Sequence, residues 1–335
     1  IGLISSLLIA LWFPLHAYAL DLTGVTFSIF IYSLFVWSLF ALSKNMQNKN
    51  KFLFLIGVFL GLLALAKSNH ILIFLSLFIA LCYFNKDILI ALKDCLKSGF
   101  VAIIIILPWS FFISSHNNTF IFTSVVGPQA LVSYSGIKMQ PPDSLMGKVI
   151  GKYDLYSDEK YKKFRSVYKL KPNPCIDKIL EYLLNDRNPY LDPKFSIAES
   201  ECYDWKDYSK LIKKSSEEVM EVYYNHLREN TIGVVVYGFS KIAHAFGFSL
   251  RGFSDYISLL FFISSFSSSI YLWRNNLYRG FVVFYWGSLT SFSLNAFILM
   301  GYVRYRVIFF DLTATILIGL MLSSLILKKS LDTKT

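Results

Sequence analysis

The stretch that decides the fold runs from residue 52 to residue 84 and reads FLFLIGVFLGLLALAKSNHILIFLSLFIALCYF. It is too long for one crossing of a hydrocarbon core, which a helix of about 20 apolar residues spans. The polar group Lys67-Ser68-Asn69-His70 divides it into two shorter apolar halves. The sequence therefore predicts two membrane-spanning helices, residues 52–67 and 70–84, joined by a polar turn at the membrane surface.

The rest of the chain has the same apolar character. Of its 335 residues, 55% are hydrophobic, 17% are aromatic and only 16% are charged. A soluble domain carries about 45–50% apolar and about 25% charged residues, so this composition excludes a soluble enzyme, a disordered tail and a disulfide scaffold. Further apolar runs predict six more spans, at residues 1–20, 24–43, 98–115, 256–273, 280–300 and 303–327. The expected fold class is an all-α polytopic membrane protein.

The start of the chain also lies within an apolar run. Ile1 opens this run without the basic segment that begins a signal peptide. We therefore expect a chain truncated inside a membrane domain, with part of its N-terminal region missing.

The distribution of charge indicates a topology rather than a nucleic-acid partner. Residues 116–230 contain 17 Lys and Arg against 16 Asp and Glu, whereas the remainder of the chain contains 16 against 6. Most of that surplus lies in short links between apolar runs, and such basic links mark the cytoplasmic side of a membrane. Seven of the nine prolines lie between residues 128 and 193. We therefore expect residues 116–230 to form a large extracytoplasmic loop domain.

Residues 231–250 decide the topology of the C-terminal half. If this segment crossed the membrane, the basic residues at 274, 279, 328 and 329 would lie outside the cytoplasm. An amphipathic helix in the membrane interface avoids this, and we expect Lys241 and His244 to face outward toward lipid headgroups. The predicted divisions are 1–115 (N-terminal spans), 116–230 (loop domain), 231–250 (interfacial helix), 256–327 (C-terminal spans) and 328–335 (cytoplasmic tail).

The strongest local motif is Arg304-Tyr305-Arg306, which opens the last span on the outer side. Two guanidinium groups there suit a phosphate or pyrophosphate, which arginine binds in a bidentate manner; the alternative is that they anchor the helix end. Asp311 follows on the same helical face as Arg304. It is either a functional group, as ionisable residues inside spans tend to be, or a partner of a buried polar group such as Asn295 or Thr313.

A second polar cluster is formed by Lys67, Asn69 and His70. Lys67 is a candidate phosphate ligand, unless the turn is simply solvated. Asp21, at the outer end of a helix, is either a cap or a weak candidate for catalysis.

Motifs for cofactors are absent from the sequence. It has no phosphate-binding glycine loop, no C-x-x-C and no H-E-x-x-H, so no cofactor is identified and a divalent metal is not supported. Cys175 and Cys202 share the loop domain, and whether they pair is left open.

Three stretches, in this order, carry a resemblance to a known family: GLLALAKSN at 61–69, ILPWSFFISSHNNTFIFTSVVG at 106–127 and GYVRYRVIFFDLTATILIGL at 301–320. They are similar, respectively, to the Leu-Thr-Arg-Pro-Asn, Pro-Trp-Thr-x-Arg-Asn and Arg-Tyr-Arg-Leu-Pro segments of the GT-C glycosyltransferases of the protein-mannosyltransferase-like group. The chain resembles the C-terminal two-thirds of these proteins.

The resemblance implies a GT-C-like bundle of transmembrane helices in a bacterial inner membrane. It implies transfer of a sugar from a polyprenyl-phosphate donor to a lipid, glycan or protein acceptor outside the cytoplasm, with membrane lipids and no nucleic acid as further partners. Arg304 and Arg306 would hold the lipid phosphate, with Lys67 as a weaker addition. The catalytic acid of that family would lie upstream of Ile1, which leaves Asp21 as a possible substitute.

Other functions remain open on the sequence alone. A transporter or flippase of lipid-linked glycans, an O-antigen polymerase or ligase, and a non-catalytic scaffold would each be rich in spans. The positions of Lys67 and of residues 304–306 favour the glycosyltransferase.

Overall fold

The computed structural model describes residues 4, 24–44, 46–117, 120–122, 131–138, 140–166, 205–250, 252–299, 306 and 310–332. Over these residues the secondary structure is helical and contains no strand. The chain divides into two compact units. One consists of residues 1–108 and 238–335 and the other of residues 109–237, and each is described by itself below.

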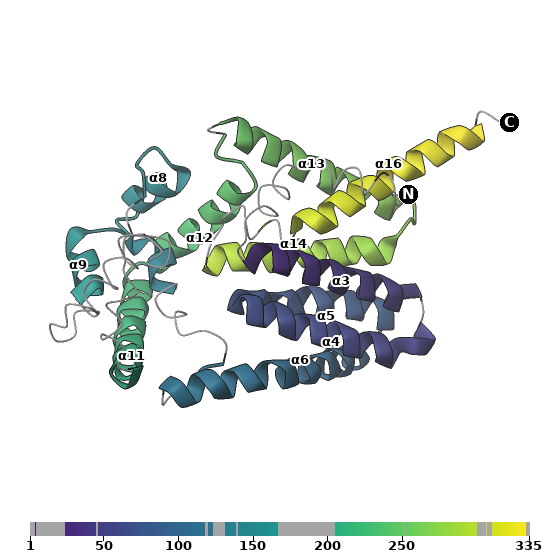
Figure 1. Ribbon diagram of the computed structural model, residues 1–335. Coiled ribbons are helices and arrows are strands. Elements are labelled where there is room, and N and C mark those ends of the chain that lie inside the picture. The colour runs from purple at the N-terminus through teal and green to yellow at the C-terminus, as the bar shows by residue number, and fades with distance from the viewer. Residues whose placement is uncertain are drawn as a thin grey trace. The chain divides into compact units, whose positions relative to one another are not determined.

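The first unit is a bundle of long apolar helices (Figure 1). In chain order these are α3 (Gly24–Lys44), α4 (Lys49–Ala66), α5 (Ile73–Asn85), α6 (Ile88–Asn117, which continues past the unit boundary), α13 (Phe253–Arg274), α14 (Arg279–Ile298) and α16 (Leu312–Asp332). Short helical turns, η1 (Met46–Asn48) and η2 (Ser68–Leu72), join α3 to α4 and α4 to α5. Within the bundle α3 packs on α4, α5 on α14, and α13 on α16.

Six of these segments are long and apolar enough to cross a membrane: Thr26–Ser43, Lys49–Ala66, Ser68–Asn85, Ile88–Ser115, Phe253–Arg274 and Arg279–Ile298. They overlap six of the spans predicted from the sequence, although Ile88–Ser115 begins ten residues before the predicted span 98–115. The last predicted span is described only in part, as the shorter apolar helix Leu312–Lys328, and the expected span at residues 1–20 lies outside the described residues. The prediction of a helical membrane protein is confirmed.

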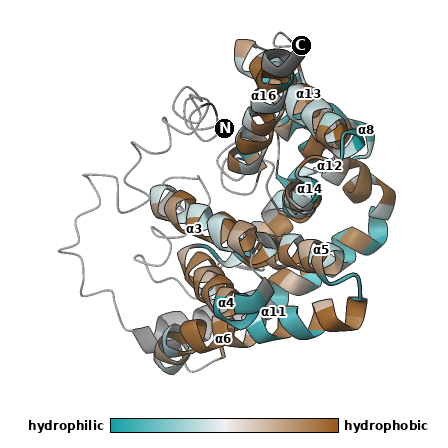
Figure 2. Cartoon of the chain, turned by 90° about the vertical axis from the view of Figure 1, so that its right-hand side faces the viewer, coloured by the Kyte–Doolittle hydropathy of each residue, from teal (hydrophilic) through white to brown (hydrophobic). Residues whose placement is uncertain are grey.

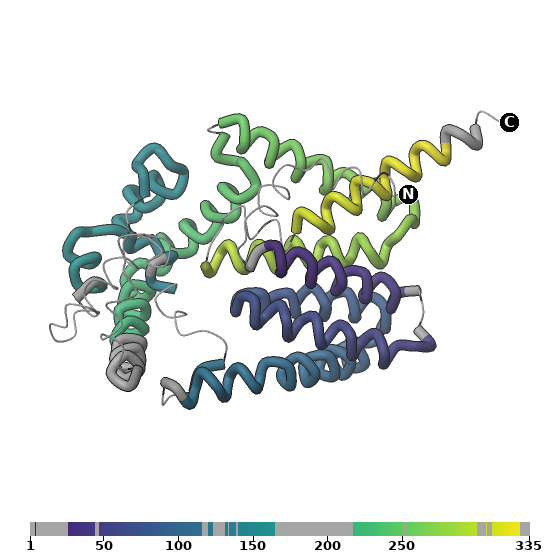
Figure 3. The backbone as a smooth tube through the Cα atoms, viewed as in Figure 1, coloured from purple at the N-terminus to yellow at the C-terminus, as the bar shows by residue number. Residues whose placement is uncertain are grey.

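Several basic residues gather at one end of the bundle, here called the basic end and defined by Lys49, Lys86, Arg274 and Arg279. The turns from α3 to α4 and from α13 to α14 lie at the same end (Figure 3). Lys49 links helices there, since it forms an ion pair with Asp94 of α6 and donates to Asn85 of α5 over 2.8 Å. The positive-inside rule predicts that this end faces the cytoplasm.

Two glycines let α4 and α6 pack closely. A Cβ atom added to Gly57 would lie 2.6 Å from the carbonyl oxygen of Ser98, and one added to Gly61 would lie 2.7 Å from the Cβ of Ile105. The Ser98 hydroxyl also donates to the carbonyl of Leu53 over 2.9 Å. Small residues and interhelical hydrogen bonds of this kind hold helices together in lipid, where the hydrophobic effect between helices is absent.

Helix α14 binds its neighbours through hydroxyl groups. Ser288 is 3.1 Å from the Tyr32 hydroxyl of α3, and Ser291 is 2.7 Å from the Ser76 hydroxyl of α5. All four side chains are buried. The hydrogen bonds fix the rotation of α14, because a turn of the helix about its axis would leave these hydroxyls unpaired in an apolar interior.

The second unit contains shorter helices: η3 (Ser133–Ile137), α8 (Leu145–Lys152), α9 (Asp158–Ser166) and α11 (Trp205–Glu229). Hydrophilic residues colour much of α11 in Figure 2, and a small core forms around Val132, Ile137, Phe164 and Val219. Helix α12 (Thr231–Ala245) begins in this unit and ends in the first. Its 15 residues extend about 22 Å, which is less than the roughly 30 Å of a hydrocarbon core.

Candidate functional site

The polar turn that divides residues 52–84 forms as expected, but one of its residues lies elsewhere. Helix α4 ends at Ala66, and the carbonyl of Leu63 accepts hydrogen bonds from the Lys67 backbone and from Nδ1 of His70, both over 3.0 Å. His70 is only 1% exposed, so the expectation of a surface position is wrong for it. The cause is that a carbonyl oxygen has two lone pairs, and the imidazole turns inward to bind the Leu63 oxygen beside the Lys67 backbone N–H.

Asn69 connects this turn to helix α14. Its Nδ2 donates to Oδ1 of Asn295 over 3.0 Å, and Asn295 is fully buried. Lys67 lies beside Asn69 and keeps part of its side chain exposed. The structure thus brings the predicted polar turn to the last turn of α14.

Lys241 connects α14 to α12. Its Nζ donates to the carbonyl of Leu299 over 3.2 Å, and the side chain is only 3% exposed. The expectation that Lys241 faces outward toward headgroups is therefore wrong. The amine lies inward because it binds the carbonyl of Leu299, the residue just after α14, and the last carbonyls of a helix have no partner within the helix. Burial lowers the pKa of Lys241 from 10.5 to about 7.

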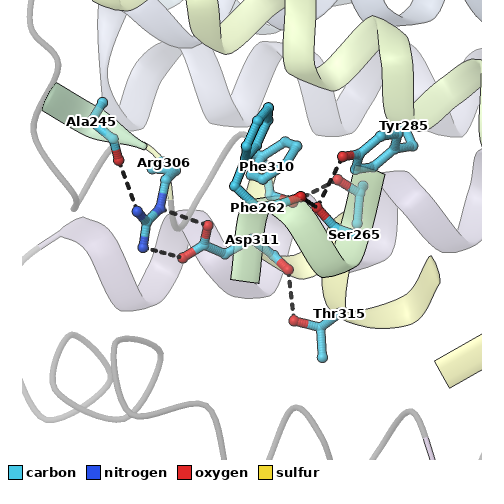
Figure 4. A network of polar contacts seen from close by, with 9 residues as sticks. Ala245, Phe262, Ser265, Tyr285, Arg306, Phe310, Asp311 and Thr315 are labelled. Atoms are coloured by element: carbon cyan, nitrogen blue, oxygen red, sulfur yellow. Dashed lines mark hydrogen bonds and ion pairs between the residues drawn. The ribbon is translucent and has the colours of Figure 1, made fainter. Parts of the chain in front are cut away.

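Arg306 and Asp311 form a buried ion pair (Figure 4). Nε of Arg306 is 2.9 Å from Oδ1 of Asp311, and Nη2 is 3.4 Å from Oδ2. Nη1 donates to the carbonyl of Ala245, on α12, over 2.8 Å. Both charged side chains are fully buried, so Arg306 does not lie at the surface as expected. A buried carboxylate needs a cation close by, and Arg306 is the cation that pairs with Asp311.

We call five residues together the polar network: Asn69, Asn295, Lys241, Arg306 and Asp311. They make three sets of contacts, namely Asn69 with Asn295, Lys241 with Leu299, and Arg306 with Asp311 and Ala245. The network joins η2, α14, α12 and the start of α16 at the end of the bundle where α4 and α14 finish. Three of the residues proposed from the sequence belong to it, and His70 and Lys67 are adjacent in the chain to Asn69. Arg304, Tyr305 and Asp21 lie outside the described residues, as do Cys175 and Cys202.

The network binds the residues on both sides of the segment 300–305, which contains Arg304 and Tyr305. Leu299, just before the segment 300–305, accepts from Lys241, and Arg306, just after it, donates to Ala245. Lys241 and Ala245 are four residues apart, one turn of α12. Leu299 and Arg306, the described residues on either side of 300–305, therefore both contact the same turn of α12.

The sequence identified Lys241 but misjudged its role. Lys241 lies in the largely apolar helix α12, TIGVVVYGFSKIAHA, which contains no acidic residue. A lysine in such a helix was the available signal for burial against a carbonyl. The sequence also contained a signal that Asn295 makes a buried hydrogen bond, since it is an amide within the apolar helix Arg279–Ile298.

Metal ligands are not gathered in the part of the chain that the structure describes. Within it, no three His, Cys, Asp or Glu side chains come together in a way that could hold a metal ion. The chemistry offered by the described network is that of hydrogen-bond donors and fixed charges.

Comparison of the chain with protein-family models, with curated proteins and with solved structures finds no match.

Proposed function

We propose that this protein is a membrane enzyme that transfers a sugar from a polyprenyl-phosphate donor to a lipid, glycan or protein acceptor outside the cytoplasm. The observation that carries the proposal is that Leu299 and Arg306, the residues on either side of the segment 300–305, are bound by Lys241 and by the carbonyl of Ala245. A phosphate-binding segment must be held in place before its donors meet the ligand, because ordering them during binding costs affinity.

The charges at the network suit an anionic leaving group. Arg306 and Asp311 neutralise each other, and Lys241 is the second basic residue of the network. Lys67 is two residues from Asn69 in the chain, and Arg304 belongs to the segment 300–305. Transfer breaks the bond between the anomeric carbon and the phosphate oxygen, and negative charge grows on that oxygen. Cations fixed in a dry site stabilise such charge more strongly than water does.

The residues then have separate roles. Arg306 is a positioning residue, since its guanidinium donates hydrogen bonds to Asp311 and to the backbone carbonyl of Ala245 on α12. Lys241 and Arg304 would hold the phosphate, with Lys67 as a further donor. A phosphate beside Lys241 favours the charged amine and so raises its pKa again, which links donor binding to proton uptake near neutral pH.

The test uses the purified protein in liposomes. Polyprenyl phosphates carrying radiolabelled hexoses or pentoses are added with a membrane extract as the source of acceptor, and release of polyprenyl phosphate is measured together with transfer of the label. Lys241→Met should lower transfer at least tenfold, whereas Lys93→Met, which removes an exposed lysine of α6, should leave it unchanged. A wild-type protein that transfers no sugar from any of these donors would refute the proposal.

A transporter of lipid-linked glycans is the second candidate, and the buried Arg306–Asp311 pair favours it. Ionisable residues inside a helical bundle often mark a transport pathway. The same liposomes distinguish the two functions. A transporter moves the labelled lipid from one leaflet to the other without releasing polyprenyl phosphate.

A further inference from the structure

Three polar side chains form a chain of hydrogen bonds at the connection between α12 and α13. Nδ1 of His244 is 3.0 Å from the Ser249 hydroxyl oxygen, and that hydroxyl donates to Oδ2 of Asp255 over 2.7 Å. All three residues are half-buried. We call them the relay.

A tight reversal of the backbone brings the relay together. Gly247 has a φ of +83°, in the region that favours glycine. A Cβ atom there would collide with the carbonyl oxygen of Asp255. Since the chain reverses at this point, the end of α12 comes to lie against the first turn of α13, where Asp255 is located.

The hydrogen bonds determine the protonation of the imidazole. A carboxylate only accepts hydrogen bonds, so the Ser249 hydroxyl donates its hydrogen to Asp255. The hydroxyl oxygen therefore accepts from Nδ1 of His244. Nδ1 therefore carries the proton in the neutral imidazole, and Nε2 carries the lone pair. In this tautomer the carboxylate of Asp255 orients the imidazole through Ser249 on the Nδ1 side, and Nε2 is the nitrogen that can accept a proton.

The relay adjoins the polar network. The residue after His244 is Ala245, whose carbonyl accepts from Arg306. One turn before it is Lys241, whose amine binds the other flank of the segment 300–305. Among the described residues, the charged groups linked to His244 by its helix or by these hydrogen bonds are Lys241 on α12, Asp255 on α13, and the paired Arg306 and Asp311.

We infer that His244 is the general base of the transfer, with Ser249 and Asp255 as the groups that position and stabilise it. The inference rests on the proposed function and names its missing base. The acceptor hydroxyl gives its proton to Nε2 of His244 while its oxygen forms a bond to the anomeric carbon. The bond from that carbon to the phosphate oxygen breaks, and the electron pair leaves on the polyprenyl phosphate.

The carboxylate stabilises the cation that results. The imidazolium keeps its Nδ1 proton on Ser249, and Asp255 balances its charge through the hydroxyl until the extra proton passes to water. A purely structural clamp on the turn would use the same hydrogen bonds. It would leave the pH dependence of turnover unchanged, and this difference separates the two roles.

The test measures transfer as a function of pH in liposomes for the wild type, for His244→Gln and for Asp255→Asn. Removal of the base should lower kcat by about 10²–10⁴-fold, with little change in the KM for the donor. The Asp255→Asn side chain still accepts from Ser249 but carries no charge. Loss of a nearby negative charge makes the imidazole a weaker base, so the acid limb of the profile should move down by about one pH unit.

His226→Gln is the matched control, because it removes a buried histidine of the second unit that binds a backbone carbonyl. It should leave kcat unchanged at pH 7 and above, where the protonation of His226 does not affect stability. An active wild type with full turnover in the His244→Gln variant overturns the base and leaves the proposed function intact. An inactive wild type overturns both.

If the His244→Gln variant fails to fold, Asp255→Asn decides the question alone. An unmoved acid limb in that variant overturns the relay.

Discussion

Lys241→Met tests whether a cation is truly buried at the polar network. The lysine is 3% exposed, and burial lowers its pKa from 10.5 to about 7. Between these two values the unfolded chain binds more protons than the folded one, so the stability of the wild type should rise with pH. Methionine has a similar length and no amine, and the variant should lose this dependence.

The magnitude follows from the two pKa values. At pH 7 the mismatch costs the folded wild type about 4 kcal/mol, and at pH 9 it costs about 2 kcal/mol, at 1.36 kcal/mol per unit of pKa. The wild type should therefore gain about 2 kcal/mol between pH 7 and pH 9 from this group. The variant loses the hydrogen bond to Leu299, which contributes about 1 kcal/mol at every pH, so it should still be the more stable protein at pH 7.

The assay is reversible unfolding in mixed micelles at pH 7, 8 and 9. Lys93→Met serves as the control, since it also removes one positive charge but from an exposed site, and it should follow the wild type. The decisive quantity is the difference between the wild type and Lys241→Met at each pH. If this difference stays constant from pH 7 to pH 9, the amine is hydrated and the reasoning is refuted.

Three further predictions concern groups away from this amine. Burial lowers the pKa of His226 from 6.5, so the second unit should lose stability as the pH falls below 6.5; hydrogen exchange at pH 7 and pH 5 should show this in the wild type and not in His226→Gln. Gly61→Leu should lower the stability of the first unit by more than about 2 kcal/mol through overpacking, whereas Gly151→Ala, where a Cβ meets no atom within 4 Å, should not; thermal unfolding separates them. Arg306→Met should cost about 3–5 kcal/mol by stranding Asp311, and Arg306→Met with Asp311→Leu should recover most of it; the same unfolding assay gives all three values.

The sequence predicts the spans well because a span is a local property. The division at Lys67-Ser68-Asn69-His70 is visible within the stretch itself, because 33 residues are too many for one span of about 20 and the polar group separates two shorter apolar halves. Chain length and composition suffice for such a prediction. The six confirmed spans are all of this kind.

The direction in which a polar side chain points cannot be predicted from the residues around it in the sequence. Lys241 turns inward because of a carbonyl 58 residues away, and Arg306 because of one 61 residues away. Each of these partners lies at the end or start of a helix, and which helix ends meet depends on the packing of the whole bundle. A basic residue near a predicted membrane surface looks the same in sequence whether it binds a headgroup or a carbonyl.

The polar network explains why these inward contacts matter for the segment 300–305. Apolar surfaces alone do not select one arrangement of helices in lipid, because the lipid tails are as apolar as the side chains. Hydrogen bonds such as the one between Asn69 and Asn295 select the arrangement of the helices instead, since breaking them leaves polar groups unpaired. The positions of Leu299 and Arg306 are therefore set by the network, and so is the distance that the six residues between them must span. A variant that weakens the network without touching Arg304 should consequently impair donor binding, which makes Asn295→Leu a test of whether the segment must be held at both flanks: an unchanged KM for the donor in this variant would show that it need not be.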